Sequence, residues 1–136
     1  MKKFLILFVV VLLLVGCSGR NDVIVIEEES FIAQVSELQM NPSEYVGRTV
    51  RYEGMFRTIY SFLTGEQQHQ VIRYMFGCCG IDGVIGFEVY LGNIEPFSDY
   101  AWVEVIGVLE LHELFLRIAA TSVIELYERG AEVVWE

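Results

Sequence analysis

The chain has 136 residues, and nine Lys and Arg stand against nineteen Asp and Glu, for a formal net charge of −10. It is 54% hydrophobic with only two Pro, which excludes disorder for most of its length, and the length allows one domain rather than two. A phosphate backbone demands Lys and Arg, so the acidic balance argues against nucleic acid as a partner.

The N-terminus is typical of an exported protein. Lys2 and Lys3 give a positive start, and an unbroken apolar run follows from Phe4 to Val15. The run fits the core of a signal peptide and is shorter than the roughly 20 residues of a membrane-spanning helix. It ends in Leu14-Val15-Gly16-Cys17, which is similar to the lipobox of bacterial lipoproteins.

The lipobox resemblance implies that Cys17 is lipidated on sulfur and becomes the new N-terminus, with acyl chains such as palmitate holding it to the extracytoplasmic face of the cell membrane. An ordinary signal peptide with a chance Cys is the alternative. We expect a signal peptide over 1–16, a lipidated N-terminus and tether over 17–30, and one domain over 31–136. Without Lys2 and Lys3, seven basic residues remain against nineteen acidic ones. The resulting negative charge either repels the domain from an anionic lipid surface or contributes only to solubility.

One helix precedes the strands of the predicted domain. Apolar residues recur at helical spacing from Phe31 to Leu38, Ser30 is a suitable N-cap, and Pro42 requires the helix to end before it. The acidic run of Glu27 to Glu29 suits a solvated helix N-terminus better than a metal site.

The rest of the chain is typical of β structure. A strand-like segment lies at 23–26, a polar loop at 61–70, and an apolar tail at 133–135 is expected to pack back onto the domain. The five main strands are expected over 49–56, 70–76, 84–91, 101–111, and a broken 114–119 with 122–127.

Five strands without long intervening helices indicate an antiparallel sheet that is closed or nearly closed. Gly54 and Gly107 lie inside strand patterns, where they suggest the bulges or bends by which a small barrel turns its corners. The sequence therefore predicts a mainly β fold, a small five-stranded OB-like antiparallel barrel with one N-terminal helix. A small sandwich is the second choice.

Two stretches resemble known proteins. The run from Asn41 to Val50, followed by Glu53-Gly54, is similar to the opening of many bacterial OB-type domains. A second pattern is similar to the soluble C-terminal domain of YcgQ-like membrane proteins, a family of unknown function, from about Phe31 to about Leu126. The residues that carry it are Arg73-Tyr74, Cys78-Cys79, Asp82, Trp102-Val103 and Gly107.

The YcgQ-like resemblance implies an extracytoplasmic accessory role in transport, because members of that family usually join this domain to membrane helices and are encoded beside predicted permeases. This chain departs from the pattern in having the lipobox Cys17 in place of membrane helices, and Gly83 where Ala is usual. The expected partners are therefore the membrane, through the lipid anchor, and a membrane permease.

The adjacent Cys78 and Cys79 are the unusual chemistry of the mature chain, and three interpretations compete. In the first, both thiols with Asp82, supported by His69 or His112, bind zinc or copper(I). Neighbouring strand residues point to opposite faces, so this requires a turn, which flanking glycines permit. In the second, the thiols are redox-active. In the third, they are small core residues.

Other polar residues have simpler interpretations. Arg73 is expected to pair with Asp82 or Asp99. His112 shares a strand face with Glu110, where polar-out alternation favours a solvent-facing edge over a metal pair. His69 is expected in the polar loop. Trp102 and Tyr74 are expected to be core aromatics first and ligand platforms second.

The sequence holds no nucleophile elbow, phosphate-binding loop, zinc-protease helix motif or dinucleotide fingerprint. We therefore expect a protein that acts by binding rather than catalysis. The leading hypothesis is a metal or small-ligand accessory to a permease. A ligand-free interaction module with structural cysteines and a thiol redox protein are the alternatives.

Overall fold

The computed structural model describes residues 22–135, and strands dominate it, as predicted, beside one main helix. Its strands are β1 (Ile24–Val25), β2 (Thr49–Tyr60), β3 (Gln67–Gly77), β4 (Gly80–Tyr90), β5 (Trp102–His112), β6 (Phe115–Glu125) and β7 (Val133–Val134). Its helices are the 3-10 turn η1 (Glu28–Ser30), the main helix α2 (Phe31–Met40) and the short α3 (Pro42–Tyr45). The main helix ends just before Pro42, where the sequence predicted its end.

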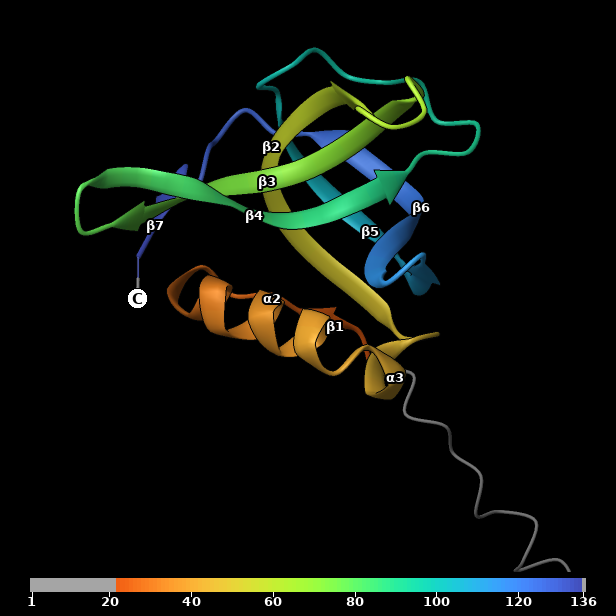
Figure 1. The fold of residues 1–136 in the computed structure, drawn as a ribbon, viewed down its shortest axis with the longest axis horizontal. Helices are drawn as coiled ribbons and strands as arrows, with labels where there is room; N and C mark the ends of the chain where they lie inside the picture. Colours follow the sequence, from red (N-terminus) through yellow and green to blue (C-terminus); the bar gives the residue numbers. More distant parts are fainter. Residues whose placement is uncertain (1–21, 136) are drawn as a thin grey trace, which may run out of the picture.

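The strands form one seven-stranded sheet in the order β1-β2-β5-β6-β4-β3-β7, and an additional pairing joins β2 to β3. The five long strands therefore pair in a ring, because β2 contacts both β5 and β3 (Figure 1). Within the ring only β4 and β6 run parallel. The short β1 and β7 add to β2 and β3 as parallel partners, so the sheet has two more strands than the five predicted.

Several strands differ in extent from the sequence prediction, since β2 continues to Tyr60 and β4 begins at Gly80. Strand β3 begins at Gln67, within the predicted polar loop, because Gln67 to Gln70 continue the ladder with β2. Strand β6 is continuous, and the sequence-predicted break in it is a bulge at Thr121, which has no partner because Ser122 pairs with Ile106 and Ala120 with Gly107. Polar composition alone does not end a strand whose backbone groups are paired by a neighbour.

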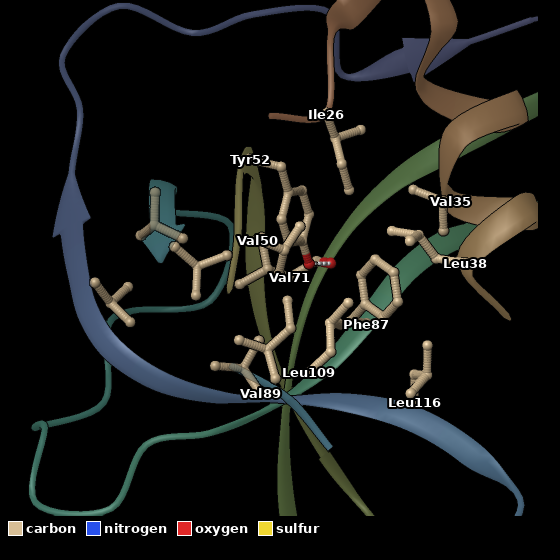
Figure 2. Packing of buried hydrophobic residues seen from close by; sticks show 14 of the residues in the cluster. Ile26, Val35, Leu38, Val50, Tyr52, Val71, Phe87, Val89, Leu109 and Leu116 are labelled. Carbon is tan, nitrogen blue, oxygen red and sulfur yellow. Dashed lines mark hydrogen bonds between the residues drawn. The ribbon is translucent and has the colours of Figure 1, made fainter. Parts of the chain in front are cut away.

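The core fills the ring and the space beneath it, where α2 closes one end (Figures 1 and 2). The helix buries Phe31, Val35 and Leu38 against the strands. Near the centre, Tyr52 is 2% exposed and its hydroxyl donates a hydrogen bond of 2.6 Å to the Val71 carbonyl. Burial raises the pKa of Tyr52 above its usual value, so the neutral phenol is the form that packs here.

The packed fold begins before the predicted domain boundary at residue 31. Ile24 and Val25 pair with β2, and the Ile26 side chain is 5% exposed within the core. Residues 24–30 are thus part of the fold and not a free tether, while Cys17 and the segment 1–16 lie outside the described residues. No helix within residues 22–135 is long and apolar enough to cross a membrane.

Gly107 and Gly54, where the sequence suggested bulges or bends, lie at close approaches between strands. A Cβ on Gly107 would lie 2.4 Å from the Ala119 carbonyl oxygen, next to the bulge at Thr121 in β6. A Cβ on Gly54 would lie 2.9 Å from the Ile72 carbonyl oxygen. Both glycines let neighbouring backbones approach more closely than any side chain allows.

We expect Gly107→Ala to lower the free energy of unfolding by about 1–3 kcal/mol, because backbone atoms cannot move aside without disturbing the ladder. Gly83→Ala is the matched control, since its Cβ would meet only the flexible end of Met75, at 3.3 Å. That change should stay within about 0.5 kcal/mol. Urea titrations of both variants check this, and equal effects would contradict the close-approach explanation.

Candidate functional site

Cys78 and Cys79 form the two-residue turn between β3 and β4. The flanking Gly77 and Gly80 pair directly with each other, and Gly80 adopts φ +127, which side-chain-bearing residues rarely do. The hairpin reaches well beyond the ring, so the cysteine turn lies at its tip (Figure 1). The glycines thus provide the turn that a shared role of the two thiols requires.

Both cysteines are free and exposed, and their Sγ atoms lie 3.4 Å apart. The turn removes the alternation by which adjacent strand residues point to opposite faces. The interpretation of Cys78 and Cys79 as buried core residues does not fit, because both side chains reach solvent. The pair is available to an ion, an oxidant or a partner without any opening of the fold.

Asp82 lies close to the turn, as its spacing suggested. Its carboxylate occupies the space over Gly77, where a Cβ on that glycine would come 1.4 Å from Asp82 Oδ2. An open groove of about 380 Å³ runs beside this contact. The groove is lined by Ile32, Met75, Phe76, Gly77, Cys78, Asp82 and Trp135.

Two exposed aromatics border the groove. Phe76 is 52% exposed and Trp135 is 69% exposed, and their rings meet edge to face with centroids 6.1 Å apart. The predicted packing of the C-terminal tail is therefore confirmed, with Val133 and Val134 in β7. The tail brings an apolar wall to the thiol-bearing hairpin.

Within residues 22–135 no group of three or more His, Cys, Asp or Glu side chains is arranged to hold a metal ion. The donors that lie together at the tip are the two thiols of Cys78 and Cys79. Structural zinc takes four protein ligands in a tetrahedron, whereas two thiolates suit copper(I). The donor set therefore favours a soft ion of low coordination number over zinc.

His69 and His112 lie away from the cysteine turn. His69 is on β3 rather than in a loop, nine residues before Cys78, or roughly 25–30 Å along a strand. Its ring stacks on Phe56 with centroids 5.3 Å apart, and burial lowers its pKa. His112 has Nδ1 3.4 Å from a carboxylate oxygen of Glu88.

Arg73 does not pair with Asp82 or Asp99, and this corrects the sequence prediction. Asp99 accepts a hydrogen bond of 2.7 Å from the Thr58 amide, and Asp82 is exposed at the tip. Arg73 is 2% exposed, and its guanidinium reaches Glu28, with Nη1 3.3 Å from Oε2. Its Nε donates 3.0 Å to the Glu53 carbonyl.

Two aromatic rings flank the same guanidinium. The Arg73 Cζ lies 4.4 Å from the Phe31 ring centroid and 5.0 Å from that of Trp102, the core aromatic that the sequence predicted. Burial lowers the pKa of Arg73, and the nearby Glu28 carboxylate opposes that shift. The group stays charged, since a guanidinium is not deprotonated in proteins.

Glu28 is the residue whose role the sequence did not indicate. The same carboxylate oxygen that meets Arg73 also accepts a hydrogen bond of 3.1 Å from the Ala131 amide. A Cβ on Gly130 would lie 2.5 Å from that oxygen and 3.1 Å from the Trp102 ring. The sequence shows Gly130 beside the tail and Glu28 before the helix, but nothing in their spacing indicates that they meet.

The family model of the DUF1980 C-terminal domain, a domain of unknown function, matches residues 15–128. The matched segment covers α2, the five long strands and the Cys78–Cys79 turn. No curated protein and no solved structure matches the chain.

Replacing Arg73 should destabilise the fold far more than replacing a surface arginine. We expect Arg73→Met to cost about 2–3 kcal/mol, because it removes a hydrogen bond, an ion pair and two ring contacts from a buried site. Arg129→Met is the matched control, since Arg129 pairs with Glu132 at the surface and the two side chains are 42% and 46% exposed. It should cost less than about 1 kcal/mol. Equal costs in urea titrations would rule out the buried guanidinium as a major stabilising contact.

The thiols of Cys78 and Cys79 should react in the folded protein. We expect a small disulfide reagent to modify two more thiols per chain in the wild type than in a Cys78→Ser, Cys79→Ser double variant, without added denaturant. The absorbance of the thiol released from the reagent measures the number of modified cysteines and checks this. A difference that emerges only after unfolding would contradict the exposed turn.

Proposed function

The chain belongs to the DUF1980 C-terminal domain family, and on that premise we propose that it is a lipid-anchored extracytoplasmic protein that binds a soft metal ion. The ion is held by Cys78 and Cys79, and the protein serves as an accessory to a membrane permease. The observation that carries this proposal is the pair of exposed thiols with Sγ atoms 3.4 Å apart on a glycine-flanked turn.

The residues of the YcgQ-like pattern divide into two groups, and the division supports the proposal. Arg73 and Trp102 are buried and contact each other, and Gly107 permits a close strand approach, so these three have structural tasks. Cys78 and Cys79 are exposed and pack against no core, so their presence is not explained by folding. Binding of a ligand would explain the presence of the two thiols.

The ring of five long strands supports an OB-like barrel. The pairings run β2-β3-β4-β6-β5 and back to β2, with one parallel contact between β4 and β6. Antiparallel folds manage exposed edges by closing in this way. In such a barrel the outer part of the β3–β4 hairpin extends beyond the strands that close the wall and is not required for closure.

The anchor follows from the lipobox-like segment that ends at Cys17. Lipidation there would leave a short segment between the membrane and the first packed residue, Ile24. The mature chain is strongly acidic, so the domain would stand away from an anionic bilayer while the lipid keeps it near membrane proteins. A permease is the partner class that the YcgQ-like resemblance suggests.

Thiol redox activity is the second candidate, and the same 3.4 Å separation favours it. Two thiols so close lose two electrons and two protons to an exogenous disulfide, forming one internal disulfide and two product thiols. A bond between adjacent residues strains the ring that it closes and is therefore easily reduced. A ligand-free interaction module is left as the outcome if neither metal nor oxidation is found.

Mass spectrometry of the full chain, exported, purified in detergent and never exposed to chelator, tests the proposal. We expect the native mass to exceed the denatured mass by one copper ion, and the Cys78→Ser, Cys79→Ser variant to lose it. Asp82→Asn should retain the ion if the thiols are the donors, and both variants should keep wild-type melting temperatures because the three side chains are exposed.

The other outcomes separate the alternatives. A denatured mass lower by about two hydrogens, absent in the double variant, would favour the redox function. A reduced chain without metal, even after addition of copper(I) under a reductant, would overturn metal binding and leave the interaction module. A tetrahedral zinc ion in place of copper would mean that a second molecule completes the site.

A further inference from the structure

A polar row crosses four strands on the outer surface, on the side of the ring away from the cysteine turn. Gln70 on β3 pairs in register with Glu88 on β4, Glu88 with Arg117 on β6, and Arg117 with Glu110 on β5. Neighbours in each strand, such as Val71, Phe87 and Ile118, point into the core. The row is therefore a continuous band of hydrogen-bonding groups.

The charges of this row are matched to one another. Arg117 Nε lies 2.5 Å from a Glu110 oxygen, and Arg117 Nη1 lies 3.7 Å from Glu88. The other Glu88 oxygen meets His112 Nδ1 at 3.4 Å. With two carboxylates and one guanidinium, the band has no surplus of positive charge and offers no attraction to an anionic ligand.

The surface is hollowed along the row. Two adjoining hollows, of about 600 and 200 Å³, share the side chains of Gln68 and Glu88. Together they have the size of pockets that hold small organic ligands. A hollow becomes a binding site where several polar groups converge on it. Here amide, carboxylate and guanidinium groups converge.

Two exposed aromatics stand in these hollows. Tyr90 is 55% exposed in the larger hollow, and Arg117 lies over its ring at 5.0 Å. Phe115 is 68% exposed in the smaller one. An apolar ring face beside a band of hydrogen-bonding groups is complementary to a ligand with one apolar and one polar aspect.

One polar atom of the row is unsatisfied. Gln70 Oε1 is buried and has no hydrogen-bond partner among the described residues, and Gln70 lines the smaller hollow. Buried acceptors are nearly always paired, so an unpaired one calls for a donor. A hydroxyl donates to such an oxygen without bringing a charge.

We propose that this groove binds a neutral oligosaccharide. Sugar hydroxyls donate to the amide oxygens and carboxylates of the row and accept from its amide N–H groups and its guanidinium, and the C–H face of a sugar ring packs on Tyr90 or Phe115. The absence of surplus positive charge disfavours nucleic acid and acidic glycans. The inference is independent of the metal proposal, because it uses none of the residues at the Cys78–Cys79 turn.

Calorimetric titration of the full chain in detergent with chitohexaose and maltohexaose tests this inference. We expect saturable binding of at least one of them, and no comparable binding of a hexamer of galacturonic acid, which carries a charge on each sugar. Tyr90→Ala and Gln70→Leu should each weaken binding about tenfold.

Tyr127→Ala is the matched control, because Tyr127 is 106% exposed and lines neither hollow of the groove. It should leave the affinity unchanged. Binding of neither neutral hexamer at millimolar concentration would overturn the proposal. So would equal effects of the Tyr90 and Tyr127 variants, or tighter binding of the acidic hexamer.

Discussion

The buried guanidinium of Arg73 is the constraint on which the rest of the fold depends. A charge taken out of water must be paired and hydrogen-bonded, and here the partners come from three distant parts of the chain. Glu28 comes from the segment before the helix and Glu53 from β2, while Trp102 and Phe31 cover the group from either side. Through Glu28 the same contact reaches the C-terminal segment at Ala131.

This arrangement explains how a long hairpin stays ordered beyond the ring. Arg73 fixes β3 at the point where it leaves the ring of long strands, and the next residue, Tyr74, pairs with Val133 of β7. Outward of Met75, the last residue of β3 that pairs with β7, β3 and β4 pair only with each other, and Gly77 and Gly80 flank the turn. The base of the β3–β4 hairpin is therefore stabilised by the buried, paired charge of Arg73. The residues at its tip are not constrained by core packing.

Much of the architecture was predictable because strand alternation and helical spacing are local. The positions of the five long strands, the end of the helix before Pro42, and the bulge next to Gly107 all follow from patterns within a few residues. The partner of Arg73 was not predictable, since Glu28 lies 45 positions away in the chain and only the fold brings them together. His69 was misplaced for a related reason: its polar neighbours suggest a loop, but the pairing of β3 with β2 holds it in a strand.

The incomplete donor set at the hairpin tip is what links the proposed metal to the proposed partner. A resident structural ion is enclosed by four protein ligands, which makes it slow to leave. Cys78 and Cys79 alone would leave such an ion incompletely enclosed at an exposed turn, where a ligand from a second protein could reach it. An exposed tip beyond the ring, bordered by Phe76 and Trp135, offers such a partner both the ion and an apolar contact. Under the proposed function, a site with two donors is therefore suited to passing its ion to a partner. A site with four donors on the same hairpin would release the ion less readily.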